Sequence, residues 1–144
     1  MSFSPHLRFF ACICAFFGLV AAAPAGPLKF RPQEIANDLT VGYAVNLVDM
    51  NDDRKTDIVV VDSRRVIWYE NPTWKVHTII DEQTKPDNVC IAPYDIDGDG
   101  KLDFALGADW RPSDTKTGGT IQGLRRPSSA GLWEVRAIGE EPTT

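Results

Sequence analysis

The acidic stretch at residues 95–103, Asp-Ile-Asp-Gly-Asp-Gly-Lys-Leu-Asp, restricts the fold more than any other part of this 144-residue chain. Carboxylates stand at its positions 1, 3, 5 and 9, and two glycines allow a tight turn between them. Several hard oxygen ligands gathered in one turn suit Ca²⁺. The same nine-residue frame occurs at residues 49–57, Asp-Met-Asn-Asp-Asp-Arg-Lys-Thr-Asp, 46 residues earlier. The chain therefore contains an internal repeat built around a candidate calcium loop.

The residues around these loops exclude the EF-hand, the commonest calcium loop with a similar spacing. An EF-hand needs a bidentate Glu at position 12, and Val60 and Leu106 stand there instead. It also needs flanking helices, whereas residues 45–48 and 58–61 are β-branched, strand-like runs. Each loop is therefore predicted to join two adjacent strands, so that a bound ion would brace a hairpin.

Each repeat contains four strand-like segments in the same order, with the acidic loop between the first and the second. They are residues 45–48, 58–61, 66–69 and 74–80 in the first unit, and 89–91, 104–107, 120–124 and 133–138 in the second. Four short strands per unit and a period near 45 residues are typical of β-propeller blades. We therefore predict an all-β fold, a partial β-propeller of two four-stranded antiparallel blades.

The blade boundaries follow from these segments. Blade 1 is predicted over residues 39–84 and blade 2 over residues 85–144, with an inserted loop at 111–119 whose Pro, Ser, Asp, Thr and Gly content is typical of loops. The N-terminal segment, residues 26–38, repeats at Phe30 and Ile35 the aromatic-to-Ile spacing of the fourth strands, which predicts one extra edge strand. Two blades cannot close a ring, so we expect a fragment of a longer propeller, or self-association through the open blade faces.

Residues 1–25 are predicted to be a signal peptide. Arg8 provides the positive region, residues 9–20 an apolar stretch too short to span a bilayer, and residues 21–25 small residues suited to cleavage, which we place after Ala25. The protein is therefore expected to be secreted, periplasmic or extracellular, without membrane insertion after cleavage. Only Cys90 then remains, which excludes an internal disulfide and makes bound metal the more plausible cross-brace.

The overall charge narrows the range of partners. The formal net charge is −5 and the pI about 4.9, which argues against nucleic acid and anionic membranes. Much of this acidity lies in the two loops, where Ca²⁺ would neutralise it.

Three stretches together resemble the secreted bacterial FG-GAP/VCBS repeat proteins, which are integrin-α-like β-propellers. Residues 95–103 match their D-x-D-x-D-G-x-x-D calcium loop, residues 104–108 (Phe-Ala-Leu-Gly-Ala) are similar to the stretch that names the repeat, and residues 68–72 (Trp-Tyr-Glu-Asn-Pro) are similar to their aromatic-x-Asn-Pro turn. The resemblance covers about residues 30 to 141 and implies a calcium-binding propeller, but no particular activity.

Side chains at positions 1, 3, 5 and 9 and the carbonyl at position 7 are the expected ligands of structural Ca²⁺. They are Asp95, Asp97, Asp99, Lys101 (backbone only) and Asp103 in the second loop, and Asp49, Asn51, Asp53, Lys55 (backbone only) and Asp57 in the first. The alternative is a pair of solvated acidic turns without an ion. Asn51 lacks a charge, and Arg54 replaces a glycine, which is costly if that position needs a positive φ. The second loop is therefore predicted to bind Ca²⁺ more tightly.

Outside the loops, Asp109, Trp110 and Arg111 form a candidate ligand-binding group at the entrance of the inserted loop, although Trp110 could simply cover that loop. Trp74 and Trp133 recur in register, which favours packing between blades. We interpret Cys90 as a small buried residue.

These features favour a binding function over an enzymatic one. The first hypothesis is a secreted module with structural Ca²⁺ that binds protein or carbohydrate. The alternatives are a fragment of a propeller-scaffold enzyme acting on sugars, of the polysaccharide lyase or sugar dehydratase type, or a truncated frame without independent activity. No nucleophile elbow, Walker loop or dinucleotide motif occurs in the sequence, so whether the protein is an enzyme stays open.

Overall fold

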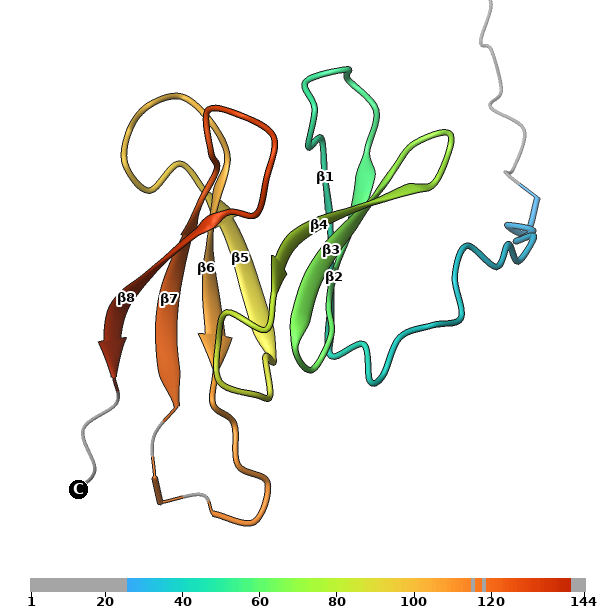
Figure 1. Cartoon of the computed structure of the whole chain (residues 1–144). Helices are drawn as coiled ribbons and strands as arrows, with labels where there is room; N and C mark the ends of the chain where they lie inside the picture. The colour runs from blue at the N-terminus through green and yellow to red at the C-terminus, as the bar shows by residue number, and fades with distance from the viewer. Residues whose placement is uncertain (1–25, 115, 118, 141–144) are drawn as a thin grey trace, which may run out of the picture. The chain divides into compact units, whose positions relative to one another are not determined.

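The computed structural model describes residues 26–114, 116–117 and 119–140. The chain divides into two compact units, Met1–Gln33 and Glu34–Thr144. In the first unit, residues 26–33 have no regular secondary structure, and the predicted signal peptide lies outside the described residues. The second unit contains the strands (Figure 1). No helix long and apolar enough to cross a bilayer occurs in the described part of the chain.

The described residues of the second unit form two four-stranded antiparallel sheets. The first, here called the first blade, has the order β1 (Ala44–Val48), β2 (Asp57–Val61), β3 (Arg65–Glu70) and β4 (Lys75–Asp81). The second blade has the order β5 (Cys90–Tyr94), β6 (Asp103–Ala108), β7 (Thr120–Arg125) and β8 (Glu134–Glu140). The predicted all-β fold of two four-stranded blades is confirmed, and the two sheets do not close into a ring.

The strand registers of the two blades match in detail. Val48 pairs with Asp57 in the first blade as Tyr94 pairs with Asp103 in the second, so each acidic loop leaves its sheet at the same point. The pairing of the third and fourth strands is irregular at Val66/Ile67 and at Ile121/Gln122, one step into the third strand in both blades. The repeat seen in the sequence is therefore a structural repeat.

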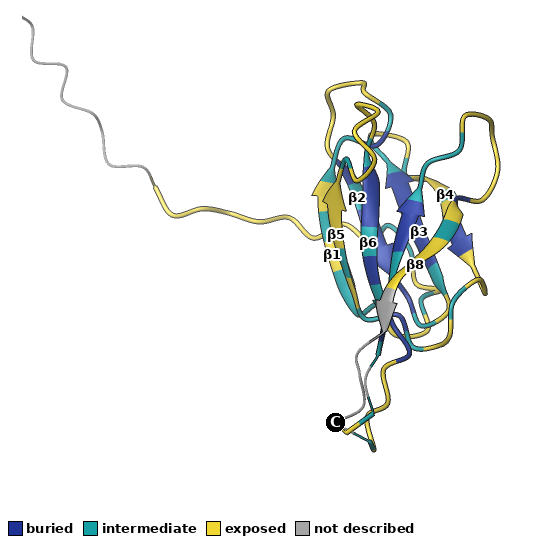
Figure 2. Ribbon diagram, turned by 90° about the vertical axis from the view of Figure 1, so that its left-hand side faces the viewer, coloured by how far each residue is buried: buried dark blue, intermediate teal, exposed yellow. Residues whose placement is uncertain are grey.

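The main core lies between the two blades. Alternation along β2 turns Val59 and Val61 to one face, and together with Trp68 they pack in one cluster with Phe104 and Leu106 of β6. Burying side chains of this size stabilises a fold by roughly 1.5–3 kcal/mol each. Figure 2 shows the buried residues concentrated in β2, β3 and β6, with exposed residues along β1 and β5.

The opposite face of the first blade is covered by an N-terminal segment. Val60, Ile67 and Tyr69 form a second cluster, on which Ile35, Ala36, Leu39 and Trp74 pack. The predicted edge strand at residues 30–35 is wrong, because residues 26–39 form no strand. Residues 35–39 lie across a sheet face instead of along an edge, so their side chains bury apolar surface without joining the ladder of backbone hydrogen bonds.

Predictions for three single residues have different outcomes. Trp133 is buried in the core between the two blades, as predicted. Trp74 packs on the cluster of Val60, Ile67 and Tyr69, which is not the core between the blades, so the predicted packing between blades is confirmed for Trp133 only. The prediction that Cys90 is buried is wrong: the thiol is exposed. Cys90 pairs with Gly107 on the face of the second blade that points away from the core, and its Sγ occupies the space that a side chain at Gly107 would need.

Candidate metal centre

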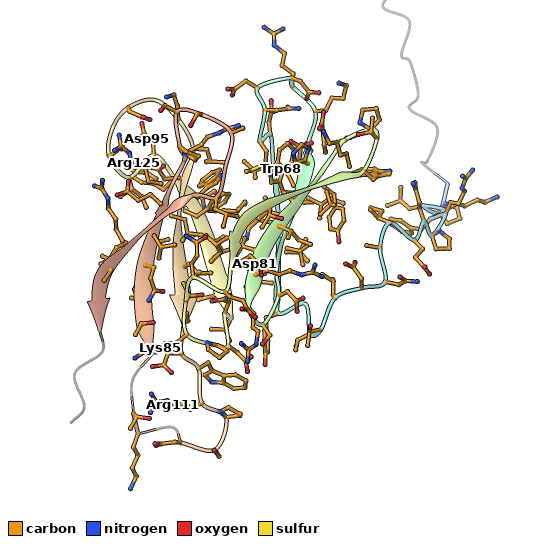
Figure 3. All side chains as sticks on the ribbon, viewed as in Figure 1. Trp68, Asp81, Lys85, Asp95, Arg111 and Arg125 are labelled. Atoms are coloured by element: carbon orange, nitrogen blue, oxygen red, sulfur yellow. The ribbon has the colours of Figure 1, made fainter. Side chains whose placement is uncertain are left out.

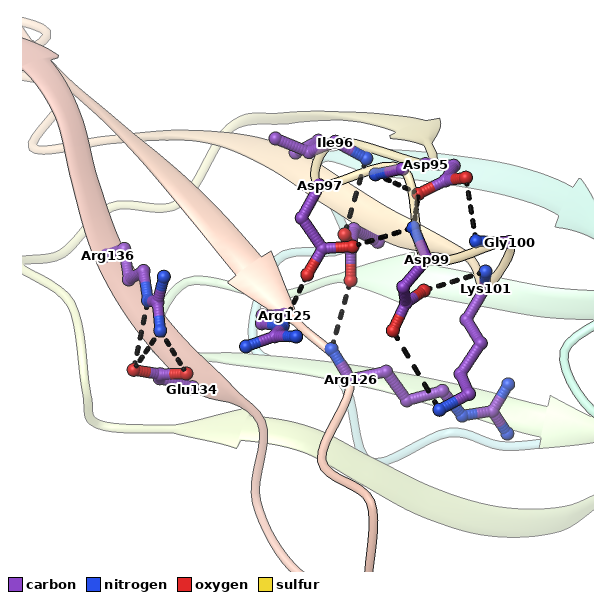
Figure 4. A network of polar contacts seen from close by, with 12 residues as sticks. Asp95, Ile96, Asp97, Asp99, Gly100, Lys101, Arg125, Arg126, Glu134 and Arg136 are labelled. Atoms are coloured by element: carbon purple, nitrogen blue, oxygen red, sulfur yellow. Dashed lines mark hydrogen bonds and ion pairs between the residues drawn. The ribbon is translucent and has the colours of Figure 1, made fainter.

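The two acidic loops connect β1 to β2 and β5 to β6, as predicted. In both loops the Asp at position 1 organises the turn by accepting backbone N–H groups. Asp95 Oδ1 accepts from Gly98 (2.8 Å) and Asp99 (3.1 Å), and Oδ2 accepts from Gly100 (2.9 Å), as Figure 4 shows. One carboxylate thus satisfies three backbone donors that the tight turn would leave unpaired.

The first loop repeats this pattern. Asp49 Oδ1 accepts the N–H groups of Asn51 (3.3 Å) and Asp53 (3.2 Å), and its Oδ2 accepts that of Arg54 (2.7 Å). The oxygens at positions 3 and 5 also accept backbone N–H groups two residues further on, in both loops. The two loops therefore share most of one hydrogen-bond network. They differ in one donor to the Asp at position 1, which is Asn51 at position 3 in the first loop and Gly98 at position 4 in the second.

The Asp at position 9 ties each loop to the end of the third strand. Asp57 is fully buried, and its carboxylate accepts the N–H groups of Met50 and Asn71, both at 2.8 Å. Asp103 accepts in the same way from Ile96 (3.3 Å) and Arg126 (3.1 Å). Each of these buried carboxylates is satisfied by two backbone donors from different segments, so it links three parts of its blade.

Both loops use a left-handed backbone at positions 4 and 6. Gly98 and Gly100 have φ values of 76° and 82°, and the corresponding Asp52 and Arg54 have 62° and 66°. Position 6 does need a positive φ, so the sequence-based concern about Arg54 is justified. Asp52 at position 4 has the same backbone strain, which was not predicted. The sequence signal is the glycine, Gly98, at position 4 of the second loop.

In the second loop, three carboxylates converge. Asp95, Asp97 and Asp99 each place an oxygen within 4.8 Å of the others, and these residues are half-buried or exposed. Asp103 lies outside this group, because its oxygens face the backbone donors described above. The structure therefore brings together positions 1, 3 and 5 of the predicted ligand set and places position 9 at the base of the loop.

Two cations face these carboxylates (Figure 4). Lys101 Nζ lies 3.8 Å from Asp99 Oδ2, and Arg125 Nε approaches Asp97 Oδ2 at 2.5 Å as an ion pair without hydrogen-bond alignment. Arg125, at the end of β7, was not among the predicted site residues. The sequence signal for Arg125 is found by aligning the third strands of the two blades, because Arg125 then stands at the position of Glu70.

In the first loop a lysine also stands at position 7. Lys55 Nζ lies 2.7 Å from Asp53 Oδ2, and this hydrogen bond lowers the pKa of the Asp53 carboxyl. Asn51 supplies an amide oxygen where the second loop has a carboxylate. At the predicted ligand positions the first loop thus has fewer anionic oxygens, and its internal counter-ion is closer.

The predicted ligand-binding group lies at the other end of the second blade. Figure 3 shows Arg111 and Lys85 at the end of the blade opposite to Asp95 and Arg125. Asp109 is buried and pairs with both cations, Arg111 at 3.1 Å and Lys85 at 3.4 Å. These two partners, Arg111 first, lower the pKa of Asp109. Trp110 is 45% exposed and contacts the Tyr43 ring edge-on.

A buried carboxylate that the sequence analysis missed lies in the turn after β2. Burial alone would raise the pKa of Asp62, but the N–H groups of Thr40, Val41 and Ser63 and the guanidinium of Arg65 outweigh it and lower the pKa to about 2. Asp62 thereby attaches the N-terminal segment to the first blade. Its Asp-Ser sequence is common in exposed turns, so the sequence alone gives no signal of this role.

Two open sheets of four antiparallel strands, each with an acidic loop between its first and second strands, define a β-propeller-type repeat module. The family model of the FG-GAP-like repeat matches residues 26–106, and the chain belongs to this family. No curated protein and no solved structure shows significant similarity to the chain.

Proposed function

We propose that this protein is an exported, calcium-binding FG-GAP-like repeat module in which Ca²⁺ has a structural role. The observation that supports calcium most directly is the convergence of Asp95, Asp97 and Asp99 oxygens within 4.8 Å. Three carboxylates at this spacing repel one another, and a divalent cation with oxygen ligands relieves that repulsion. Mg²⁺ fits less well, because it prefers octahedral geometry with retained waters.

The proposed ligands of the second loop are the side chains of Asp95, Asp97 and Asp99, the Lys101 carbonyl, and a free lone pair of Asp103. In the first loop they are Asp49, Asn51, Asp53, the Lys55 carbonyl and Asp57. Each Asp at position 9 already accepts two backbone N–H groups, so its main contribution is to hold the loop in place. In each loop the ion would replace the lysine at position 7 as the counter-charge of the carboxylates. In the second loop it would also replace Arg125.

Calcium titration of the full 144-residue chain by calorimetry, with and without EDTA, tests this proposal. The Asp99→Asn variant removes one anionic ligand at constant size and is expected to weaken binding at the second loop by about tenfold or more. Asp81→Asn, an exposed carboxylate outside both loops, is the matched control and should bind like the wild type. Absence of a binding signal in the wild type would refute the calcium site.

Export is the second part of the proposal, and it depends on residues 1–25 acting as a signal peptide. Mass spectrometry of the protein released by a secreting bacterial host should show a chain that begins at Gly26. A released or retained product with residues 1–25 intact would contradict this part.

The proposed partner is a protein or carbohydrate. Trp110 supports a contact in the group of residues 109–111, since it exposes almost half of its surface on a loop of a rigid sheet. The Trp110→Ala variant should weaken partner binding while leaving calcium binding intact. Unchanged partner binding would show that Trp110 only covers Tyr43.

Self-association is proposed for the face of the second blade that points away from the core. Ile121 and Ile138 are 51% and 57% exposed there. Each blade has two faces, and they can be matched by position in the sequence relative to the acidic loops. By this match, the exposed face of the second blade is equivalent to the face of the first blade that contains Val59 and Val61, and that face is buried against the second blade. Sedimentation velocity should show concentration-dependent dimers that Ile121→Lys abolishes. A strictly monomeric wild type would contradict this.

A further inference from the structure

A groove with a volume of about 680 Å³ lies at the junction of the two blades, and none of its lining residues belongs to an acidic loop or to residues 109–111. One wall is β4, with His77 and Thr78, and the other is the turn at residues 126–133 between β7 and β8. Trp68 also lines it. Figure 1 shows this turn as the orange-red loop between β7 and β8, and β4 as the green strand. The volume is within the range of roughly 300–1,000 Å³ that is usual for small-molecule sites.

The walls are held together by hydrogen bonds. The Trp133 N–H donates to the Ile79 carbonyl (2.8 Å), and Gln83 Nε2 donates to the Trp133 carbonyl (3.3 Å). The Trp133 ring packs on Phe104 in the core, with 5.5 Å between ring centroids. The turn therefore has a fixed position against β4, which a preformed binding site requires.

Arg126 is the charged residue of this groove, and it has a cation–π contact instead of a carboxylate partner. It is half-buried, and its guanidinium carbon lies 5.8 Å from the centroid of the Trp133 ring. The other half-buried arginines, Arg65 and Arg125, each have a carboxylate within hydrogen-bonding or ion-pair distance. Among the described residues, Arg126 has no carboxylate within 4.0 Å. A partly desolvated guanidinium favours a bidentate anionic partner, and a carboxylate fits it.

The other polar lining residues are three hydroxyl-bearing side chains and a histidine, and the rest are aromatic or apolar. Thr78, Ser128 and Ser129 are exposed and line the groove. The His77 ring is stacked on Trp68 (4.2 Å between centroids, 12° between planes), and its Nε2 lies 2.8 Å from Glu70 Oε2. His77 is thereby held in one orientation. Hydroxyls beside aromatic edges suit a ligand that is itself rich in hydroxyls and has an apolar ring face.

We propose that this groove binds a carboxylate-bearing saccharide, with the carboxylate on Arg126 and the sugar hydroxyls on Thr78 and the two serines. An acidic peptide could also offer a carboxylate, but the exposed hydroxyls at the wall favour a polyhydroxylated ring. The inference specifies the carbohydrate-binding role proposed above. None of the groove residues is a proposed metal ligand, although the Arg126 N–H donates to Asp103 at the base of the second loop, so the two proposals are tested separately.

Saturation-transfer NMR and calorimetry of the full chain with glucuronate and galacturonate test the inference. At least one uronate should bind in the millimolar range, and glucose, which lacks the carboxylate, should bind at least about tenfold more weakly. The Arg126→Gln variant should lose at least about tenfold in uronate affinity. It keeps the backbone N–H that donates to Asp103, so the fold should be preserved, which circular dichroism checks.

The matched control is Arg64→Gln, an exposed arginine paired with Glu82 outside the groove, which should bind uronate like the wild type. Binding of neither uronate, or equal binding by Arg126→Gln, would overturn the inference. So would a hexaglutamate peptide that binds more tightly than both uronates. A calcium titration of the same samples separates the proposals, because calcium binding without uronate binding refutes only the groove, and the reverse refutes only the metal site.

Discussion

The loops at residues 49–57 and 95–103 have the same backbone but different charges. In both, the Asp at position 1 accepts N–H groups within the turn, and the Asp at position 9 accepts one from position 2 and one from the residue after the third strand. Their side chains differ, most clearly at Asn51 against Asp97 and at Arg54 against Gly100.

The comparison separates the residues that build the loop from those that adjust its charge. The first loop keeps this shape although it has non-glycine residues at both positive-φ positions. The hydrogen bonds accepted by the Asp residues at positions 1 and 9 are therefore sufficient to form the turn. The charge differs: Arg125 faces Asp97 in the second blade, whereas the same strand position in the first blade is Glu70. Ion affinity and loop stability can therefore be changed independently.

The largest expected effect concerns the Asp at position 9. Asp57→Ala and Asp103→Ala should each lower the free energy of unfolding by about 3 kcal/mol, because each leaves two backbone donors without a partner. Urea denaturation in calcium-free buffer measures this, with Asp81→Ala as a control that should change stability little. A large loss in only one blade would break the equivalence of the two loops.

Acid should affect the first blade selectively through Asp62, since the corresponding position at the end of β6 is Ala108. The pKa of Asp62 is about 2 in the folded state against 3.8 unfolded, so its stabilisation is complete above pH 3.8 and is lost as the pH falls from 3.8 to 2. This shift corresponds to about 2 kcal/mol. The stability gap between wild type and Asp62→Asn should be constant above about pH 4 and close between about pH 4 and pH 2. A gap independent of pH would contradict the assignment.

The difference in ligand charge predicts a difference in calcium affinity. Asn51→Asp gives the first loop the missing carboxylate and should raise its affinity by about tenfold, while Asp97→Asn should lower that of the second loop by a similar factor. Two-site calorimetry measures both, and the exposed Asn37→Asp is the control for added charge. If Arg125→Gln raises the calcium affinity of the second loop, the ion pair between Arg125 and Asp97 competes with calcium. If the affinity is unchanged, Arg125 has no effect on calcium binding.

The smallest expected effect is the backbone strain of the first loop. Arg54→Gly should stabilise the fold by up to about 1 kcal/mol, because glycine adopts a φ of 66° without steric cost. The reciprocal Gly100→Ala should destabilise by a similar amount through φ alone, since no atom lies within 4 Å of the added Cβ. Thermal melting detects both, and Arg64→Gly serves as the control without positive φ. Destabilisation by Arg54→Gly would mean that its side chain makes a contact that outweighs the strain.

Much of the fold was predictable, because a strand-like run on each side of a short acidic loop predicts two antiparallel strands joined as a hairpin. Residues 58–61 are such a run, and residues 104–107 occupy the same position in the second repeat; both belong to strands in the structure. The segment at residues 30–35 was mispredicted because its aromatic-to-Ile spacing says nothing about whether a strand partner exists. Cys90 was mispredicted because the sequence does not show that its face of the second blade points away from the core.

The candidate site was predictable in its residue types but not in its electrostatics. The spacing identified Asp95, Asp97 and Asp99, which the structure brings together. It did not reveal that Asp103 turns its oxygens to backbone donors, nor that Arg125 reaches Asp97. Both depend on the register between β6 and β7, which brings residues about 20 positions apart in the sequence to the same end of the sheet.

Anomalous X-ray scattering from a crystal of this protein grown with a lanthanide in place of Ca²⁺ tests the central claim most directly. The account predicts a strong peak between the carboxylates of Asp95, Asp97 and Asp99, with Lys101 Nζ and the Arg125 guanidinium moved away from them. A crystal without a peak at that position, in which Arg125 still pairs with Asp97, would contradict it.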